Sequence, residues 1–242
     1  MNDSTWLHWS GGKDSAYALH KLTQQGGKLG GIVTSLSSEF RRISMHGVRE
    51  ELLEAQAAAL RLPLQKILIP RDCNMEDYNS MISEEMAKLK AIGATHCAFG
   101  DIFLEDLKLY RQKQMDASQL ETVFPIWKEN STATMAKSII ESGVKAVVVC
   151  VSGKHFDSSF VGRDYDLEFL NDLTEGVDPC GENGEFHTFV YDSPNFSQPI
   201  PVKLGEVVDK LYTPASNQED EPECGAKPSW DTEFFFQELS RC

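Results

Sequence analysis

The sequence has no two cysteines close enough to form a C-x-x-C pair. Its six cysteines stand singly, at positions 73, 97, 150, 180, 224 and 242. The spacing therefore gives no indication of a structural zinc or iron–sulfur site. Cys97 and Cys150 fall in apolar runs typical of buried strands, where cysteine acts as a small hydrophobic residue. We expect the thiols to be reduced.

Positive charge is also scarce. The 242 residues include 23 lysines and arginines against 37 aspartates and glutamates, giving a formal net charge of −14. Proteins that bind nucleic acid in bulk carry basic surfaces, because phosphate neutralisation dominates their affinity. A local basic patch at Arg41, Arg42 and Arg49 is compatible with this acidic balance. The charge argues against bulk nucleic-acid binding and favours a small-molecule or protein substrate.

Long apolar runs are missing as well. No run approaches the roughly 20 residues that a membrane-spanning helix needs. The opening residues MNDSTWLHWS lack the basic start and apolar core of a signal peptide. We therefore expect a cytoplasmic protein with no membrane partner.

Short apolar runs alternate with amphipathic segments along the first 150 residues. Such alternation implies a parallel sheet covered by helices on both faces. We therefore predict a doubly wound, Rossmann-like α/β fold. The expected strands cover 5–9, 31–36, 64–69, 96–100, 122–127 and 145–151, and the expected helices cover 14–26, 47–60, 75–93 and 131–143.

The character of the sequence changes near residue 130. We predict two domains, residues 1–130 and a smaller α+β domain of residues 131–242. The segment 214–229 is acidic and contains several prolines, which favours a loop or a loosely held tail. The other expected features of the second domain are a helix at 162–173, a turn-rich stretch at 178–189, a β-like stretch at 191–212 and a terminal strand at 231–239.

A glycine loop lies between the first expected strand and the first expected helix. It reads Ser10-Gly11-Gly12-Lys13-Asp14-Ser15. Its glycines allow backbone N–H groups to turn toward an anion, and the helix that follows favours negative charge at its start. The spacing differs from the Walker A pattern G-x-x-x-x-G-K-[ST]. The loop therefore predicts a phosphate cradle of another kind.

The side chains of this loop have separate expected tasks. Ser10 and Ser15 can donate hydroxyl hydrogen bonds, and Lys13 can balance phosphate charge. Asp14 suits either of two tasks, an N-terminal helix cap or a ligand for the Mg²⁺ that accompanies ATP. We expect an alanine at position 13 to abolish turnover in an intact fold.

S-G-G-K-D-S after a first strand resembles the PP-loop of the ATP pyrophosphatase superfamily, which has the HUP-like α/β fold. The resemblance implies that the loop binds the β,γ-pyrophosphate of ATP and that AMP is transferred to an acceptor. GMP synthetase-type amidotransferases, tRNA-thiolating enzymes and NAD synthetases share this signature. The loop therefore implies the ATP chemistry and leaves the acceptor open.

Other stretches narrow the resemblance. FGDIFLEDLKLYRQK at 99–113, FPIW at 124–127 and DPCGENGEFHTFV at 178–190 together resemble the diphthine–ammonia ligase family. RISMHGVREELLEAQ at 42–56 is similar to that family's connection from the second strand to its helix. The resemblance covers most of the chain up to about residue 205. It implies an AMP-forming ligase whose partners are ATP, ammonia and a carboxylate acceptor, which in the family is diphthine on elongation factor 2.

Gly100 and Asp101 lie just beyond the fourth expected strand, where ligands collect in parallel sheets. Asp101 and Glu105 suit Mg²⁺ or ribose hydroxyls, and Glu105 equally suits the cap of the following helix. We assign Gly100 to ATP binding and Asp101 to catalysis and Mg²⁺ binding, together with Asp14.

The 178–188 stretch crowds acidic, imidazole and hydroxyl side chains around potential turns. This composition suits recognition of an amine-bearing substrate, and a solvated β-hairpin is the alternative. Diphthamide-making members of the family read E-G-G-E-Y-E-T here, whereas this chain has Asn183 and His187 in place of a glycine and a glutamate. The expected substrate-binding residues of this stretch are Glu182, Glu185, His187 and Thr188.

Further candidates lie outside these motifs. His46 can face the adenylate or serve as a structural polar residue, and Arg49, Arg111 and Arg163 can steady anions or be surface charges. We include His46 and Arg49 among the substrate-binding residues. Cys180 has no base nearby in sequence and is a poor nucleophile candidate.

The predicted activity is amide formation through an acyl adenylate, with ammonia displacing AMP. Since the sequence indicates no glutaminase domain, free ammonia is the simplest nitrogen donor, and a homodimer is an open expectation. One alternative is adenylation of a small carboxylic acid or of tRNA. Another is an ATP-binding sensor or partner module without turnover.

Overall fold

The computed structural model describes residues 4–43, 46–212 and 232–242. Its first half contains a five-stranded parallel sheet in the order β3-β2-β1-β4-β5. The strands are β1 (Thr5–His8), β2 (Leu29–Ser37), β3 (Leu64–Ile69), β4 (His96–Ala98) and β5 (Glu121–Val123). The strand order reverses direction between β1 and β4, which is the usual ligand-binding point of such sheets.

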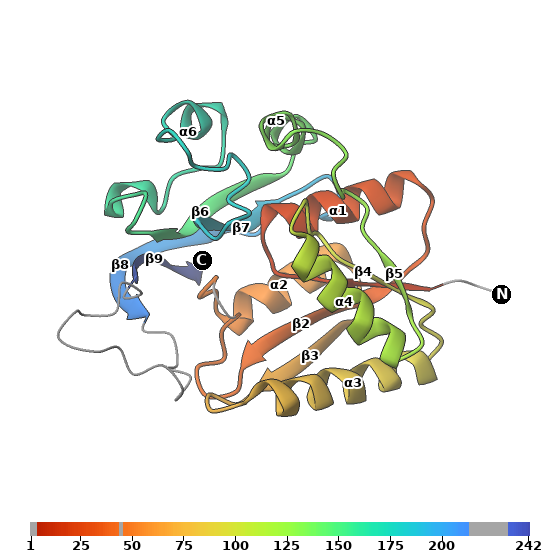
Figure 1. The fold of residues 1–242 in the computed structure, drawn as a ribbon. Helices are drawn as coiled ribbons and strands as arrows, with labels where there is room; N and C mark the ends of the chain where they lie inside the picture. Colours follow the sequence, from red (N-terminus) through yellow and green to blue (C-terminus); the bar gives the residue numbers. More distant parts are fainter. Residues whose placement is uncertain (1–3, 44–45, 213–231) are drawn as a thin grey trace.

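Helices cover both faces of this sheet, as predicted. Figure 1 shows α3 and α4 along one face, with α1 and α2 on the side that faces the second half of the chain. Adjacent strand residues point to opposite faces: Leu7 packs with the α1 and α2 cluster, whereas Trp6 packs with α3 and α4. The helices are α1 (Lys13–Gln24), α2 (Glu50–Leu60), α3 (Met75–Ala91) and α4 (Glu105–Ala117).

The second half contains a four-stranded antiparallel sheet in the order β7-β6-β9-β8. Its core is continuous with the α1 and α2 side of the first sheet, since Leu19, Leu52, Val148 and Phe189 belong to one buried cluster. The elements are α5 (Thr132–Glu141), β6 (Lys145–Ser152), η1 (Ser158–Phe160), α6 (Leu167–Asn171), β7 (Phe186–Asp192), β8 (Val202–Tyr212) and β9 (Thr232–Arg241).

Two expectations fail in this second half. The run at 145–151 continues the strand–helix alternation in sequence, yet as β6 it belongs to the antiparallel sheet. The helix expected at 162–173 shrinks to α6, because Gly162 and Tyr165 donate backbone N–H groups to Val148 and Ala146 of β6 at 2.8 and 2.7 Å. Backbone pairing with β6 thus prevents the first residues of the 162–173 segment from forming a helix.

Smaller differences concern element ends. The strand expected at 122–127 ends at Val123, and β7 begins at Phe186, inside the stretch expected to be turn-rich. The terminal strand expected at 231–239 is β9. The acidic segment 214–229 lies outside the described residues. No helix in the described part is long and apolar enough to cross a membrane.

Candidate active site

The glycine loop joins the end of β1 to the start of α1 at the carboxyl edge of the parallel sheet. Gly12 occupies the N-cap position without a side-chain cap bond. Asp14 therefore does not cap the helix and lies in its first turn, where a negative charge complements the helix dipole. The N–H groups of this first turn have no partners within the helix.

The β4 exit approaches the start of α1 closely. A Cβ atom added to Gly100 would lie 3.0 Å from the carbonyl carbon of Asp14 and the nitrogen of Ser15. A side chain at this position would press on the backbone at the start of α1, so glycine is favoured there. The contact brings Asp101 to the same place as Asp14, although 87 positions separate them in the sequence.

A cavity of about 410 Å³ opens at this point. It is lined by residues from the ends of β1 and β4, from β2 and the segment after it, from α1, α3 and α4, and from β7 and the loop before it. The predicted ATP-binding residues Gly11 and Gly12 do not line the cavity. Among the sequence-predicted residues, it brings together Ser10, Asp14, Ser15, His46, Gly100, Asp101, Arg111, Glu182 and His187.

The cavity is rich in polar atoms that the protein leaves unsatisfied. Across the described residues, eight buried side-chain nitrogen or oxygen atoms have no hydrogen-bond partner. Five of them belong to cavity-lining residues. Buried polar groups are normally paired, so such a concentration indicates a polar ligand. The five atoms are His8 Nε2, Asp14 Oδ1, Asp101 Oδ2, Arg111 Nε and His187 Nε2.

The amine of Lys13 does not line this cavity. Lys13 is 2% exposed, and its Nζ donates to Asp14 Oδ2 at 2.9 Å and to the Cys180 carbonyl. It also lies 5.0 Å from the centre of the Phe186 ring. Although burial disfavours the ammonium, the Asp14 carboxylate holds the pKa of Lys13 above its ordinary value. The amine thus joins α1 to the second half of the chain.

Three carboxylates face the cavity, and burial raises the pKa of each. The pKa of Asp101 is also raised by Asp14 and lowered by Arg111, whose Nε lies 3.7 Å away. Burial is likewise the main cause for Asp14, where Lys13 opposes it. Burial, reinforced by Asp14, raises the pKa of Glu182 to about 7, and one oxygen of Glu182 accepts the Ile102 N–H at 2.8 Å.

Three imidazoles complete the lining, and burial keeps them neutral. It lowers the pKa of His8 to about 3 and that of His46 to about 4. Burial, aided by His46 and Lys13, also lowers the pKa of His187 well below its usual range. The rings of His46 and His187 lie 4.7 Å apart, and His8 stacks on Phe99 at 4.3 Å. His46 Nδ1 lies 3.1 Å from the Thr188 carbonyl and therefore carries the proton.

The lowered pKa of His8 predicts an acid-sensitive contribution to stability. As pH falls from 6.5 to 4.5, the unfolded chain binds a proton at this residue while the folded protein does not. The folded state is therefore destabilised by about 2 kcal/mol over that interval. Replacing His8 with leucine should remove this loss. Urea denaturation of His8→Leu and wild type at both pH values measures the difference.

The exposed His155 provides the matched control. If His155→Leu gave the same pH-dependent gain in relative stability, the effect would not come from burial of His8. The prediction would also be contradicted if the free energy of unfolding changed with pH equally in wild type and His8→Leu.

Several predicted residues lie outside the cavity lining. The Thr188 hydroxyl accepts the Lys13 backbone N–H at 3.0 Å, on β7 rather than in a loop. Arg49 pairs with Glu238 at 2.9 Å, and Glu105, at the first helical position of α4, pairs with Lys128.

Glu185, a predicted substrate-binding residue, holds the turn before β7. Its carboxylate is 3% exposed and accepts the backbone N–H groups of Asp178 and Asn183, each at 3.0 Å. These bonds close the turn before β7. Cys180 is buried, burial raises its pKa, and its Sγ contacts the Thr132 carbonyl, so it is no activated nucleophile.

Other residues line the cavity although their sequence context did not identify them as site residues. His8 ends β1 and Trp9 follows it, and Thr34 and Ser35 interrupt the apolar run of β2. Polar residues near the carboxyl end of a buried strand are the signal that identifies them. Tyr78 and Phe99 come from α3 and the β4 exit, and their sequence pattern is that of ordinary core residues.

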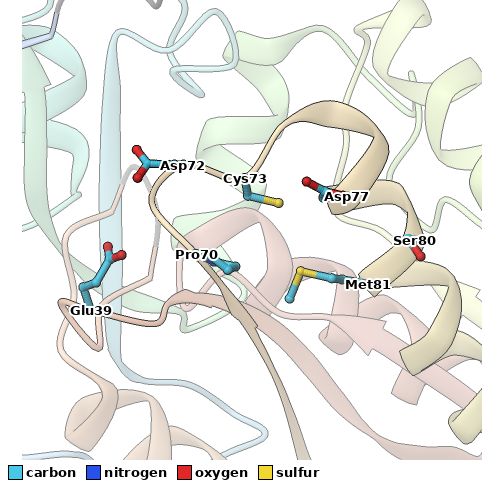
Figure 2. A pocket seen from close by; sticks show the side chains of 7 residues that line it. All are labelled: Glu39, Pro70, Asp72, Cys73, Asp77, Ser80 and Met81. Carbon is cyan, nitrogen blue, oxygen red and sulfur yellow. The ribbon is translucent and has the colours of Figure 1, made fainter.

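A second hollow lies beyond the end of β3, shown in Figure 2. Three acidic residues face it, Glu39, Asp72 and Asp77. Two of their carboxylates serve neighbouring turns: Asp77 accepts from the Asn74 amide at 2.8 Å, and Glu39 accepts the Arg71 N–H at 3.3 Å. None of the sequence-predicted site residues lines this hollow.

Comparison with known proteins places both halves of the chain in one family. Residues 4–121 match the diphthamide synthase N-terminal domain, and residues 131–214 match the diphthamide synthase C-terminal domain. A diphthine–ammonia ligase of Danio rerio is 25% identical over 233 residues, covering 85% of this chain and 89% of the relative. Those of Bos taurus and Homo sapiens are 24% identical over 224 residues, or 82% of this chain and of each relative.

Proposed function

Because the chain belongs to the diphthamide synthase family of ligases, we propose that it forms an amide by activating a carboxylate with ATP. AMP and pyrophosphate are the nucleotide products, and ammonia supplies the nitrogen. The observation that carries this proposal is the convergence of five unsatisfied buried polar atoms in one cavity beside the glycine loop.

ATP lies with its phosphates against the residues of the glycine loop and Gly100. The start of α1 favours the phosphate charge, although its Lys13 N–H is bonded to the Thr188 hydroxyl and the Ser15 hydroxyl donates to the Gly12 carbonyl at 2.9 Å. Because the amine of Lys13 is engaged elsewhere, Arg111 is the cation that lines the cavity. Its Nε has no hydrogen-bond partner and lies 3.7 Å from Asp101 Oδ2, and the guanidinium is proposed to face a phosphate or the acceptor carboxylate as well.

Asp14 and Asp101 are proposed to hold Mg²⁺, and the fit is supported by their two unsatisfied buried oxygens. The described residues contain no group of three or more ligating side chains. Two carboxylates plus substrate phosphates are a common magnesium environment. When bound, the ion neutralises charge on the phosphates.

The reaction proceeds in two steps. An acceptor oxygen attacks the α-phosphorus and pyrophosphate leaves, giving an acyl adenylate. Ammonia then attacks the acyl carbon, the bond to AMP breaks, and the new nitrogen loses a proton. Glu182, with a pKa of about 7, is suited to accept that proton near neutral pH. The protein contributes mainly position and charge neutralisation.

The acceptor of the similar proteins is diphthine, as their names state. We propose the same acceptor for this chain, with His46, Glu182 and His187 on its side of the cavity. A small carboxylic acid is the second candidate. It is favoured by His187, a neutral imidazole in the cavity where diphthamide-making members carry a glutamate that suits a trimethylammonium group.

The test is a product analysis with α-labelled ATP, Mg²⁺ and ammonium. One reaction contains elongation factor 2 bearing diphthine, and a second contains a small-molecule extract of the source cells. AMP formation that requires the factor supports the diphthine acceptor, and AMP formation that requires the extract supports a small acid. Formation of ADP, or of no labelled product in either reaction, would contradict the proposal.

Three further predictions complete the proposal. The domain division at residue 130 is supported by the change of sheet between β5 and β6. Homodimer formation is testable by light scattering after size-exclusion chromatography. A cytoplasmic location is testable by fractionation of the source cells.

A further inference from the structure

A buried glutamine stands behind the glycine loop. Gln56 lies on α2, is 0% exposed and does not line the cavity. A buried amide without partners is destabilising by about 1–3 kcal/mol for each unsatisfied group, so its bonding must be accounted for completely. The inference below rests on the proposed binding of ATP.

All the major bonds of this amide go to segments that build the site. Its Oε1 accepts the indole N–H of Trp9 at 2.8 Å. Its Nε2 donates to the carbonyl of Gly11 at 2.9 Å and to the carbonyl of Val190 at 2.7 Å. The indole is only a donor and the carbonyls are only acceptors, so the chemistry fixes the orientation of the amide.

These bonds set the orientation of a loop peptide. The Gly11 carbonyl also accepts the Val190 N–H at 2.9 Å, so two donors hold it toward α2 and β7. A trans peptide points its carbonyl and its N–H in opposite directions. The Gly12 N–H is therefore turned away from Gln56, toward Ser10 Oγ at 3.3 Å, and Ser10 lines the cavity.

Gly11 has the backbone freedom that this arrangement needs. Its φ of +81° lies in the left-handed region, and a glycine peptide there can rotate easily. A flipped peptide would present a carbonyl oxygen to the phosphates in place of an N–H. Something outside the loop must therefore hold the peptide.

We propose that Gln56 is the positioning residue of the glycine loop. It holds the Gly11–Gly12 peptide with its N–H toward the anion, and it ties the loop to β7 of the second half. A glutamate at position 56 would place a carboxylate against two carbonyl oxygens, which repel it. A methionine would remove one donor from each of the Gly11 and Val190 carbonyls and would leave the Trp9 indole without its acceptor.

The test compares ATP with AMP, which lacks the two phosphates that the loop is proposed to bind. Calorimetric titration of Gln56→Glu and Gln56→Met should show ATP affinity reduced about tenfold or more relative to AMP affinity, as expected for a lost charge-assisted hydrogen bond. Thermal unfolding reports the accompanying loss of stability.

Gln237 is the matched control. This amide, on β9, is 8% exposed and donates to the carbonyls of Gly205 and Glu238 at 2.8 and 3.0 Å. Gln237→Met should lower stability while leaving the ratio of ATP to AMP affinity unchanged. If the two Gln56 variants fail to fold, Gln56→Asn keeps an amide on a side chain one methylene shorter and should lower the ratio of ATP affinity to AMP affinity about threefold.

The outcomes are distinct. Equal losses for ATP and AMP, or no loss, would overturn the role of Gln56 while the proposed function stands. Failure of the wild-type protein to bind ATP would contradict the proposed function itself.

Discussion

Replacing Lys13 with methionine is expected to lower the free energy of unfolding by about 3 kcal/mol and to leave the ATP affinity within about threefold of wild type. Methionine is unbranched and only one atom shorter than lysine, and it removes the charge. Asp14 would then be a partly buried carboxylate without its 2.9 Å partner, and the Cys180 carbonyl would lose a donor. Turnover should fall, because Lys13 holds one oxygen of Asp14 and thereby directs the other into the cavity.

The double variant Lys13→Met/Asp14→Asn separates charge from packing. Urea denaturation should show that the second substitution recovers much of the lost stability, since removing both charges of a buried pair is far less destabilising than removing one. Unchanged stability together with a large loss of ATP affinity would show instead that the amine acts on the phosphates. The sequence alone predicts an amine that balances phosphate charge at position 13, and loss of turnover in an intact fold when alanine replaces it.

The role predicted for Lys13 from the sequence differs from its place in the structure because sequence patterns report only local structure. Glycines followed by Lys13, Asp14 and Ser15 define the start of a helix after a strand, and that helix is present as α1. The direction of the lysine amine depends on Cys180 and Phe186, which follow more than 160 positions later. No local pattern contains that information.

The parallel sheet was predictable for a related reason. The runs that contain β1, β2 and β3 are each followed by an expected helix, so local pattern and fold agree there, whereas α4 after β4 was not among the expected helices. The run at 145–151 has the same local pattern as these strands. Its place in the antiparallel sheet is decided by partners that lie later in the chain, β7 and β9.

The candidate site shows the same division. Asp14 and Asp101 each follow a strand of one parallel sheet, and the carboxyl ends of such strands share an edge, so their convergence could be predicted. His187 could be listed as a candidate, but its neighbour Thr188 could not be recognised as a loop anchor. Alternate residues of a strand face opposite sides, and the strand β7 was not expected there.

Replacing Asp101 with asparagine is expected to reduce AMP formation about 100-fold or more without lowering stability. Asparagine keeps the shape of the side chain and removes the negative charge. Asp101 is 9% exposed, and its Oδ2 lies in the cavity without a hydrogen-bond partner. The protein thus keeps a buried charge whose pKa is already raised, an arrangement that does not favour folding. Arg111, whose Nε lies 3.7 Å from Oδ2, is a cationic neighbour of this carboxylate, and the proposed Mg²⁺ would supply further positive charge there.

Steady-state rates measured over a range of Mg²⁺ concentrations test this role. The Mg²⁺ concentration for half-maximal rate should rise in Asp101→Asn, and thermal unfolding without nucleotide should occur at or above the wild-type temperature. Asp106→Asn is the matched control, because this carboxylate lies exposed in the first turn of α4, near Asp101 in sequence and outside the cavity lining. Wild-type turnover in Asp101→Asn would remove this carboxylate from the mechanism. A rate loss accompanied by an equal loss of stability would assign it to the fold, so the two measurements together decide between catalysis and structure.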